Sequence, residues 1–422
     1  MAQLLCVGID VATRLNKAQF LDDSEQLHGR LSFANDADGA SRIASHSRQL
    51  ADEIGVSQIR FGIEATGFYG WHLAMYLSKA AELEGAQTGV YLFNPRTIRG
   101  FKRAYPDLPK TDWADAFAIA ERLRFGRLPK PFNFDDRYLP LQRLTRHRVF
   151  LVKDLARLKN YFLGYLFLKC NRIAKSQGLP DPLGVAMSDI LVECYSVEEI
   201  ARTPLANLAQ AVIDKSHNKF QNPYAVAKQL QTAANHSYRL PDALKDPVNR
   251  ILASTMQVMR ELIRQIRDTE RDIQREMRAL DCPLNSVPGI GPVLAAGILA
   301  EVGDIRNFDD DDALAKFAGL TWREHQTGDF EAEDRPLTRS GNVYLRYYLV
   351  EAANLVRRYA PDYAAYYKRK HDEATKHHHK RALVLTARKL VRLIHALLRT
   401  GQPYSGPRDE VAPDPPQITL GQ

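Results

Sequence analysis

Apolar and polar residues alternate in short blocks over the first 125 residues. Short apolar runs between polar turns predict strands, and longer stretches with apolar residues on one face predict helices. The predicted order is three strands (4–9, 17–21 and 29–33), a helix (40–53), a strand (58–64), a helix from about 71, a strand (89–93) and a helix (112–125). By analogy of element order, this succession predicts an RNase H-like α/β fold.

The pattern becomes helical between residues 139 and 280. A first long segment carries basic residues over 143–159, and a second has apolar residues in mixed steps of three and four, which predicts a coiled-coil-like seam. The seam residues are Leu262, Ile266, Thr269, Ile273, Met277 and Leu280. The stretch between the two segments is rich in Asn, Gln and Pro and predicts an irregular helical insertion.

A turn rich in Gly and Pro opens the last region. Residues 288–292 (PGIGP) precede a helix of small residues and resemble a helix-hairpin-helix turn, whose amides meet a DNA phosphate. An ordinary tight turn between packed helices explains the same residues equally well. The acidic run 309–312 precedes an apolar-periodic segment and predicts a helix cap.

Composition narrows the class of protein. The chain is 45% hydrophobic and 26% charged, without an apolar run long enough for a bilayer or a signal-peptide pattern at its start. Four scattered cysteines without a Cys-x-x-Cys pair argue against a disulfide scaffold and a cysteine zinc site, and fit a reducing cytoplasm. A net charge of +8 suits a polyanionic partner.

Two predicted strands end in an acidic residue. Asp10 closes the first strand and Glu64 the fourth, and side chains at such strand ends project into the crevice where α/β proteins bind ligands. Asp112 and Asp115 lie three residues apart in a predicted helix, so both face one side. Four converging carboxylates repel one another unless cations lie between them, and hard oxygen ligands favour Mg²⁺ or Mn²⁺.

Each acid taken alone also has an ordinary structural explanation. Asp10 suits a turn or helix cap, and Glu64 suits a solvated strand end. Asp112 suits the N-cap of the next helix, with Asp115 in its first turn. The occurrence of all four in this order favours a metal site, where a pair of ions can clamp the attacking and leaving oxygens of a phosphodiester.

Three motifs together resemble the Asp-Glu-Asp-Asp (DEDD) transposases. They are GIDV at 8–11, GIEATG at 62–67 and KTDWADA at 110–116. This insertion-sequence family, numbered one hundred and ten, also includes pilin-gene DNA invertases, and the likeness is weakest between about 160 and 250. The resemblance implies a prokaryotic mobile-element protein. It further implies a structured non-coding bridge RNA that pairs with donor and target DNA.

The resemblance also implies a division of the chain. The predicted parts are a RuvC-like DEDD catalytic domain (1–130), a helical and coiled-coil region (131–280) and a mostly helical C-terminal transposase domain with a nucleophile loop (281–400). Separately, the Pro-rich and polar composition of residues 401–422 predicts a disordered tail. The fold class is therefore α/β plus α.

A family loop with a nucleophilic serine matches residues 319–330. Thr327, just before a glycine, stands at the place of that serine. A threonine hydroxyl is a nucleophile, but its added methyl is stiff at χ1 and crowds an in-line attack. Thr327 indicates a natural threonine variant, a weakened or inactive copy, or a deliberate substitution. Ser340 is the nearest serine, but Ser-Gly-Asn before a helix suits a cap, so Thr327 is favoured.

Basic residues near the C-terminus are candidates for nucleic-acid contacts. Arg323, Arg339 and Arg346 suit phosphates, because a guanidinium fork matches phosphate geometry, although each could equally be a solvated arginine. A dense basic region further along includes Lys368, Arg369, Lys380 and Arg381. That region predicts a helix with one buried side and one cationic side that binds phosphate, and a merely solvated basic face is the alternative.

Tyrosines and histidines accompany this basic region. Tyr363, Tyr366 and Tyr367 could stack on exposed bases. The three histidines at 377–379 point to different faces of a helix and make a poor tetrahedral site, so we predict no zinc there.

These observations predict a transposase or site-specific DNA recombinase. Metal-binding carboxylates would hold the scissile phosphate while the hydroxyl of Thr327 attacks it, and strand exchange would follow. Because the two sites lie in separate domains, we expect a homo-oligomer, a dimer or tetramer, to complete the site. The alternatives are a DNA invertase without an RNA guide, a RuvC-like metal-dependent nuclease that does not need Thr327, and a non-catalytic nucleic-acid-binding protein.

Overall fold

The computed structural model describes most of the chain. The described residues are 4–105, 107–132, 137–175, 179–194, 196–217, 219–322, 326–327, 330–331, 337–338 and 340–406. The chain divides into two compact units, Met1–Asp136 and Arg137–Gln422. No helix in the described part is long and apolar enough to cross a membrane.

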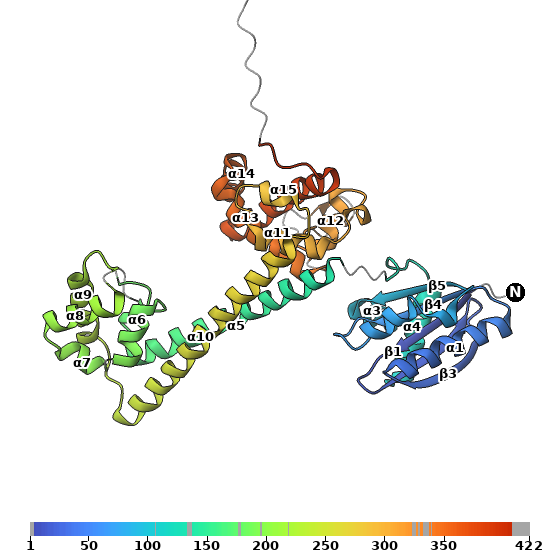
Figure 1. Cartoon of the computed structure of the whole chain (residues 1–422), viewed down its shortest axis with the longest axis horizontal. Coiled ribbons are helices and arrows are strands. Elements are labelled where there is room, and N and C mark those ends of the chain that lie inside the picture. The colour runs from blue at the N-terminus through green and yellow to red at the C-terminus, as the bar shows by residue number, and fades with distance from the viewer. Residues whose placement is uncertain are drawn as a thin grey trace, which may run out of the picture. The chain divides into compact units, whose positions relative to one another are not determined.

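The first unit is built on a mixed sheet of five strands (Figure 1). The strands are β1 (Leu4–Asp10), β2 (Leu15–Asp22), β3 (Leu27–Ala34), β4 (Gln58–Glu64) and β5 (Gln87–Phe93), in the order β3-β2-β1-β4-β5. β1 pairs antiparallel with β2 and parallel with β4, and β4 pairs parallel with β5. The five predicted strands are confirmed, with β2 and β3 longer than their apolar runs.

Helices cover both faces of the sheet. α1 (Ala37–Ile54) and α2 (Trp71–Leu77) pack on the face that carries Leu5, Val7 and Ile9. α3 (Pro95–Lys102) and α4 (Asp112–Arg124) pack on the opposite face, which carries Leu4 and Cys6. A short 3₁₀ turn, η1 (Ala81–Leu83), precedes β5. Because successive side chains of a strand point to opposite faces, Asp10 belongs to the face of α3 and α4.

Two glycines let α4 lie directly on the central strands. A Cβ atom on Gly8 would come within 2.1 Å of the Ala116 carbonyl oxygen and 2.3 Å of the Ala120 nitrogen. A Cβ atom on Gly62 would come within 2.7 Å of Ile119 Cγ2. The backbone of α4 therefore occupies the space of a side chain at Gly8, and the Ile119 and Leu123 side chains of α4 occupy that space at Gly62. These contacts hold α4 with its N-terminus over the carboxyl ends of β1 and β4.

Two long helices form a stalk in the second unit. α5 (Leu139–Lys169) and α10 (Asp242–Met277) lie side by side (Figure 1). They run antiparallel, because the start of α5 shares a core with the end of α10, and the end of α5 shares another with the start of α10. Ile266, Thr269, Ile273 and Met277 of the predicted seam are buried. Leu280 lies beyond the end of α10.

The insertion between the stalk helices is a small helical bundle. Its helices are η2 (Ile173–Lys175), α6 (Val185–Asp189), the π-helix η3 (Ile190–Cys194), α7 (Val197–Arg202), α8 (Leu205–Ser216) and α9 (Pro223–Asn235). Their apolar faces pack around the far ends of the stalk helices, with Phe162 and Leu252 fully buried among them.

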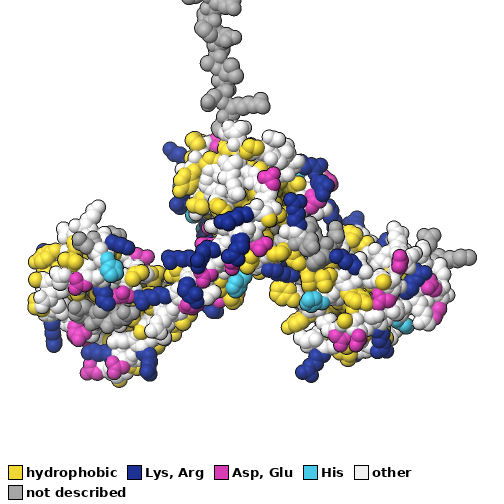
Figure 2. Space-filling model, viewed as in Figure 1, with side chains coloured by type: hydrophobic (Ala, Val, Ile, Leu, Met, Phe, Trp, Pro, Cys, Tyr) yellow, Lys and Arg dark blue, Asp and Glu magenta, His cyan; other side chains and the backbone are white. Residues whose placement is uncertain are grey.

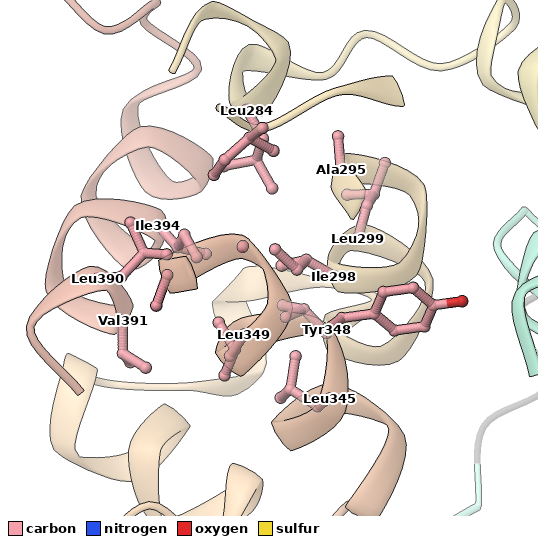
Figure 3. Close-up of a cluster of buried hydrophobic side chains, with 14 of the residues drawn as sticks. Leu284, Ala295, Ile298, Leu299, Leu345, Tyr348, Leu349, Leu390, Val391 and Ile394 are labelled. Atoms are coloured by element: carbon pink, nitrogen blue, oxygen red, sulfur yellow. The ribbon is translucent and has the colours of Figure 1, made fainter. Parts of the chain in front are cut away.

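The remaining helices form a third core at the other end of the stalk. They are η4 (Pro283–Ser286), α11 (Pro292–Val302), η5 (Ile305–Asn307), α12 (Asp311–Ala318), α13 (Val343–Tyr359), α14 (Pro361–Asp372) and α15 (His378–Thr400). Figure 3 shows side chains of α11, α13 and α15 meeting around Leu349 and Ile298. Tyr348 is fully buried there, and its hydroxyl donates to the Thr145 carbonyl of α5 at 2.8 Å.

Local features of this core confirm the predicted helix cap. Asp310 is the N-cap of α12, as the acidic run predicted. A Cβ atom on Gly289 would meet the Val356 nitrogen of α13 at 2.8 Å, so this glycine of the PGIGP turn packs against a helix. The tail is predicted to be disordered, yet its first part runs back over the core, where the Tyr404 N–H donates to Ser286 Oγ at 2.7 Å. Residues 407–422 lie outside the described residues.

Candidate active site

Asp10 and Glu64 lie next to each other at one edge of the sheet. β1 and β4 pair in parallel up to Ile9 opposite Ile63, so the two acids follow at equivalent positions. Both belong to the face that α4 covers, because Gly8 and Gly62, two residues earlier, contact α4. Both side chains are half-buried. The register of the sheet thus brings together two of the predicted acids.

Asp112 and Asp115 lie in the first turn of α4, over this edge of the sheet. Thr111, and not Asp112, is the N-cap of the helix, since its side chain accepts the Ala114 N–H at 3.2 Å. The carboxylate of Asp112 is therefore not needed as a cap, and it is exposed. Acidic residues in a first turn are also stabilised by the positive end of the helix dipole.

The charges of these acids affect one another. The pKa of Asp10 is raised to about 6, first by burial and then by the negative charges of Asp112 and Glu64. Lys102, the last residue of α3, acts in the opposite direction. Lys102 also forms an ion pair with Asp115. The edge of the sheet therefore holds mutually repelling carboxylates that one ammonium group partly balances.

Contacts of β2 and β3 fix the N-terminus of α4. The buried Gln19 donates through Nε2 to the Trp113 carbonyl at 2.6 Å. The Lys17 ammonium lies 4.9 Å from the centre of the Trp113 ring, and the Arg30 guanidinium lies 5.8 Å from it. Sequence reasoning missed these supporting residues, because their role depends on the pairing of β2 with β1, which places Gln19 opposite Gly8.

The donor set suits a hard divalent cation. It consists of carboxylate oxygens. The pKa of Asp10 is raised first by burial and then by repulsion from Asp112 and Glu64, and a bound cation would relieve that repulsion. In the described part of the chain, no three Asp, Glu, His or Cys side chains are gathered in the arrangement of a metal site. The four acids thus form an acidic edge whose side chains would have to close around an ion.

Thr327 lies in the second unit, on a small hairpin between α12 and α13. β6 (Gln326–Thr327) pairs antiparallel with β7 (Phe330–Glu331), with Thr327 opposite Phe330. Trp322 and Leu337 form an isolated antiparallel β-bridge, one before and one after the hairpin in the chain. There the Thr338 N–H donates to the Thr321 carbonyl at 2.8 Å. Two of the predicted phosphate contacts, Arg323 and Arg339, lie outside the described residues.

The buried carboxylate of Glu301 binds the residue that begins α13, after the hairpin. Asn342 caps α13, and its Nδ2 donates to Glu301 Oε2 of α11 at 2.6 Å. The Glu301 side chain is fully buried and accepts two bonds from Arg146 of α5, at 2.7 and 2.8 Å. Asn342, and not Ser340, is therefore the cap of this helix. No local sequence pattern predicts the two partners of Glu301, because Arg146 lies on α5 and Asn342 lies at the start of α13.

The predicted basic contacts are distributed over three helices. Arg346 of α13 is half-buried, and its guanidinium donates to the Ala318 carbonyl at the end of α12 at 3.0 Å. Lys368 and Arg369 lie exposed on α14, and Lys380 and Arg381 lie exposed on α15. These four side chains are thus accessible to a polyanion.

The tyrosines near this basic region lie largely against cations of the protein. Tyr363 is buried, with the Lys389 ammonium 4.6 Å from its ring centre. The same ammonium lies 4.9 Å from the Tyr366 ring, and Arg357 lies 4.3 Å from the Tyr367 ring. Stacking of these rings on bases therefore stays a prediction, which the burial of Tyr363 does not favour.

Further cations line the stalk. Arg157 of α5 and Arg264, Arg271 and Arg275 of α10 keep more than half of their side chains exposed, although each has an acidic partner one turn away. Figure 2 shows Lys and Arg side chains gathered along the stalk. Such partners balance part of the charge, as Glu373 does for Arg369 on α14, so the exposed cations of the stalk are further candidates for phosphate binding.

Two family models match the chain. One, described as a transposase of the DEDD type in the IS110 group, matches residues 7–169, which include all four acids. The other, described as the transposase IS116/IS110/IS902 family, matches residues 282–368, which include Thr327. The two matches thus cover both parts of the candidate site.

Curated relatives agree with these matches. The chain is 27% identical to an uncharacterized 44.8 kDa protein of insertion element IS116 from Streptomyces clavuligerus, over 81% of this chain and 83% of that protein. It is 34% identical to the transposase for insertion sequence element IS1111A from Coxiella burnetii, over 21% of this chain and 26% of that protein. It is 32% identical to a pilin gene-inverting protein from Moraxella bovis, over 29% of this chain and 37% of that protein.

Proposed function

This chain belongs to the IS110 family of transposases, and we propose that it breaks and rejoins DNA by phosphoryl transfer to the hydroxyl of Thr327. The observation that carries the proposal is the acidic edge of the first unit, where Asp10 and Glu64 end adjacent strands beneath Asp112 and Asp115. The order of the strands, with α4 across the carboxyl ends of β1 and β4, supports an RNase H-like, RuvC-type assignment of this unit.

The four acids would hold Mg²⁺ or Mn²⁺. When bound, such an ion supplies charge neutralisation at the scissile phosphate. The residues of this chain contribute the rest: Gly8 and Gly62 hold α4 against the strands, and Lys102 holds Asp115 through its ion pair. Carboxylates held in this way are ready for a cation without a large rearrangement of the backbone.

Thr327 would form the covalent intermediate. Its Oγ1 attacks phosphorus, the bond from phosphorus to one deoxyribose oxygen breaks, and that oxygen takes up a proton while the threonine loses its own. Attack by the deoxyribose hydroxyl of another strand reverses these events and joins the strands. The place of Thr327 on a hairpin that projects between α12 and α13 supports this role, because such a loop can reach a phosphate held elsewhere.

A structured RNA that pairs with donor and target DNA would select the sites. The exposed cations of α14 and α15 are suitable contacts for either nucleic acid, since phosphate contacts carry affinity but little sequence information. DNA inversion by the same chemistry is the alternative use, which the similarity to the pilin gene-inverting protein supports.

The covalent step can be tested by trapping. The full chain is incubated with Mg²⁺, DNA and the element's non-coding RNA, denatured, and analysed by mass spectrometry for a nucleotide attached to the peptide that contains Thr327. We expect an adduct in the native chain, more in Thr327→Ser, and none in Thr327→Ala or Asp10→Asn. Cleavage without any adduct, and equal in Thr327→Ala, would instead identify a metal-dependent nuclease.

A further inference from the structure

Two basic residues of β2 and β3 belong to the same face of the sheet as Asp10. Lys17 of β2 pairs with Asp10 of β1 across the antiparallel ladder. Arg30 of β3 pairs with Gln19, the next residue of β2 that projects to the same face as Lys17. Directly opposed residues of antiparallel strands project to one face of a sheet. Lys17 and Arg30 therefore lie on the face that α4 covers, on the β2 side of the acids.

Both cations lie against the ring of Trp113 at the start of α4. The Lys17 ammonium lies 4.9 Å from the ring centre, and the Arg30 guanidinium lies 5.8 Å from it. Trp113 directly follows Asp112 in the first turn of the helix. The Lys17 ammonium also donates to Ser32 Oγ at 2.9 Å. These contacts hold two positive groups beside the turn that carries two of the candidate acids.

The charges of this cation pair, Lys17 and Arg30, are not neutralised by carboxylates. Among the described residues neither of the two forms an ion pair, although Asp10 is the residue opposite Lys17. The positive charge that acts on Asp10 is that of Lys102, which is itself paired with Asp115. Arg30 is exposed and Lys17 is half-buried. Since contact with an aromatic ring orients a cation without neutralising it, two positive charges remain for a ligand.

Packing against Trp113 explains only part of this arrangement. Long cationic side chains cover apolar surface with their aliphatic stems, but an apolar side chain would cover an indole ring equally well. Packing does not explain why two charges converge from separate strands on one ring. Like charges repel each other unless an anion lies close to both of them, so the arrangement favours an anionic ligand.

The position of the cation pair indicates which anion would bind. One strand spacing, about 4.8 Å, separates the backbones of β2 and β1, so Lys17 lies immediately beside the acid that ends β1. In the proposed function the acids act on the scissile phosphate. The anion next to it is the neighbouring phosphate of the same DNA strand. An ammonium and a guanidinium fork both suit phosphate oxygens.

We propose that Lys17 and Arg30 bind the DNA phosphate next to the one on which the carboxylates act, with the ring of Trp113 holding both cations in place. The inference rests on the proposed function, which supplies the identity of the nucleic acid. Phosphate contacts fix the register of a strand and carry little sequence information. The cation pair would therefore place the scissile phosphate over the acids whatever the sequence of the DNA.

The first test measures how the affinity for DNA depends on salt. The full chain carries Asp10→Asn so that the DNA stays uncut. It is titrated, with Mg²⁺ and the element's non-coding RNA, into a fluorescent duplex of the element's end. Each phosphate contact contributes about 0.9 to the slope of log affinity against log salt. We expect Lys17→Met/Arg30→Met to lower this slope by about 1–2, and the affinity by about 5- to 25-fold at about 0.15 M salt.

The second test locates the phosphate. A neutral methylphosphonate replaces one phosphate of the duplex at a time, at every position of the element's end. We expect the substitution next to the cut, as mapped with the native chain, to weaken binding about 5-fold when Lys17 and Arg30 are present. The same substitution should have no further effect on Lys17→Met/Arg30→Met, because the contact is already absent. Additive losses at every position would overturn the proposal.

Matched variants separate charge from packing. Lys17→Arg/Arg30→Lys keeps two cations and should retain most of the affinity. Arg42→Met removes an exposed cation of α1, on the opposite face of the sheet, and should change neither the affinity nor the slope. Because Arg30 is exposed, Arg30→Met alone should fold even if the double variant does not, and it should lower the slope by about 1. An unchanged slope in Arg30→Met would refute the contact.

RNA binding is measured with the same variants in the absence of DNA. We expect the affinity for the element's non-coding RNA to be the same in Lys17→Met/Arg30→Met as in the chain that retains both cations. A loss of affinity for the RNA, with the affinity for DNA intact, would assign the cation pair to the RNA and overturn the proposal.

A failure of the proposed function would look different. The chain that retains Asp10 would then show no Mg²⁺-dependent cleavage and no adduct at Thr327, while the methylphosphonate scan would still find a DNA contact that depends on Lys17 and Arg30. Cleavage with an adduct, together with additive losses throughout the scan, would retain the proposed function and refute the phosphate contact.

Discussion

At the scale of single residues, the account depends on how the acids at the sheet edge affect one another. Asp10 is the central member, because it is half-buried and because the charges of Asp112 and Glu64 add to the effect of burial on its pKa. A carboxyl group with a strongly raised pKa is typical of functional sites, although ion-pair networks also perturb pKa values. The ion pair of Lys102 with Asp115 balances part of the negative charge at this edge.

Removal of the Asp10 charge should stabilise the metal-free protein. The pKa of this acid is about 6 in the folded chain, above its ordinary value of 3.8, so folding becomes less favourable as the pH rises from about 4 to 6. We expect Asp10→Asn to raise the free energy of unfolding by about 1–2 kcal/mol at pH 7, after allowance for solvent screening. Urea unfolding in the presence of a chelator measures the difference, which should vanish near pH 4. A variant that is no more stable than the native chain at pH 7 contradicts the proposed repulsion.

At the scale of elements, the central contact is that of α4 with β1 and β4. Gly8 and Gly62 allow this contact, and Thr111 caps the helix so that its acids stay available. In the second unit, Asn342 caps α13 and donates to Glu301 of α11, so the segment with the hairpin ends at a fixed point. In the first unit, β1, β4 and α4 thus place the candidate acids at their ends.

Gly8→Ala tests the first contact. The added methyl would meet the backbone of α4 at 2.1 Å, which α4 can relieve only by moving away. We expect a loss of at least about 3 kcal/mol in the free energy of unfolding. Gly100→Ala in α3, where a Cβ atom meets nothing within 4 Å, is the matched control and should be neutral or slightly stabilising. Similar stability of the two variants would show that α4 does not lie so close to β1.

In the second unit, an ion pair with a fully buried carboxylate can be compared with one whose carboxylate is partly exposed. Arg146 pairs with the fully buried Glu301, whereas Arg148, also on α5, pairs with Glu270, which is 29% exposed. Glu301→Ala removes the fully buried carboxylate shared by Asn342 and Arg146, whose own side chain is 32% exposed, and should cost about 2–3 kcal/mol. Glu270→Ala removes a carboxylate that is 29% exposed and should cost less, about 1–2 kcal/mol, because its partner Arg148 is only 18% exposed. Thermal or urea unfolding gives both values, and equal losses would refute the special role of Glu301.

The sequence predicted elements better than contacts. Apolar runs that end in an acid located β1 and β4, because burial on both faces leaves a clear local pattern. The proximity of Gly8 to Ala116 and the partners of Glu301 depend on residues far apart in the chain, and no local pattern encodes them. The cap of α4 is a similar case. The sequence suggested Asp112 as a possible cap, whereas Thr111 takes that position, and only the backbone geometry decides between two such residues.

At the scale of the whole molecule, the candidate site is divided. The four acids belong to the first unit and Thr327 belongs to the second. In the proposed mechanism, both parts must reach the same phosphate during the reaction. A homo-oligomer in which one protomer supplies the acids and another supplies the hydroxyl satisfies this requirement.

Mixed variants test such sharing. Asp10→Asn and Thr327→Ala should each be inactive alone, because each lacks one part of the site. If protomers share sites, a mixture should recover part of the native strand exchange, since some sites then combine an intact acid set with an intact hydroxyl. Absence of recovery in mixtures that are shown to co-assemble would place both parts of each site within one chain.

The most direct test of the central claim is strand exchange between donor and target DNA, with purified protein, Mg²⁺ and the element's non-coding RNA. It compares the native chain with Thr327→Ser, Thr327→Ala and Asp10→Ala. The account predicts faster exchange by Thr327→Ser, because the crowding methyl is gone, and none by Thr327→Ala or Asp10→Ala. Exchange by Thr327→Ala at the native rate would contradict it, because the hydroxyl at this position would then take no part in the reaction.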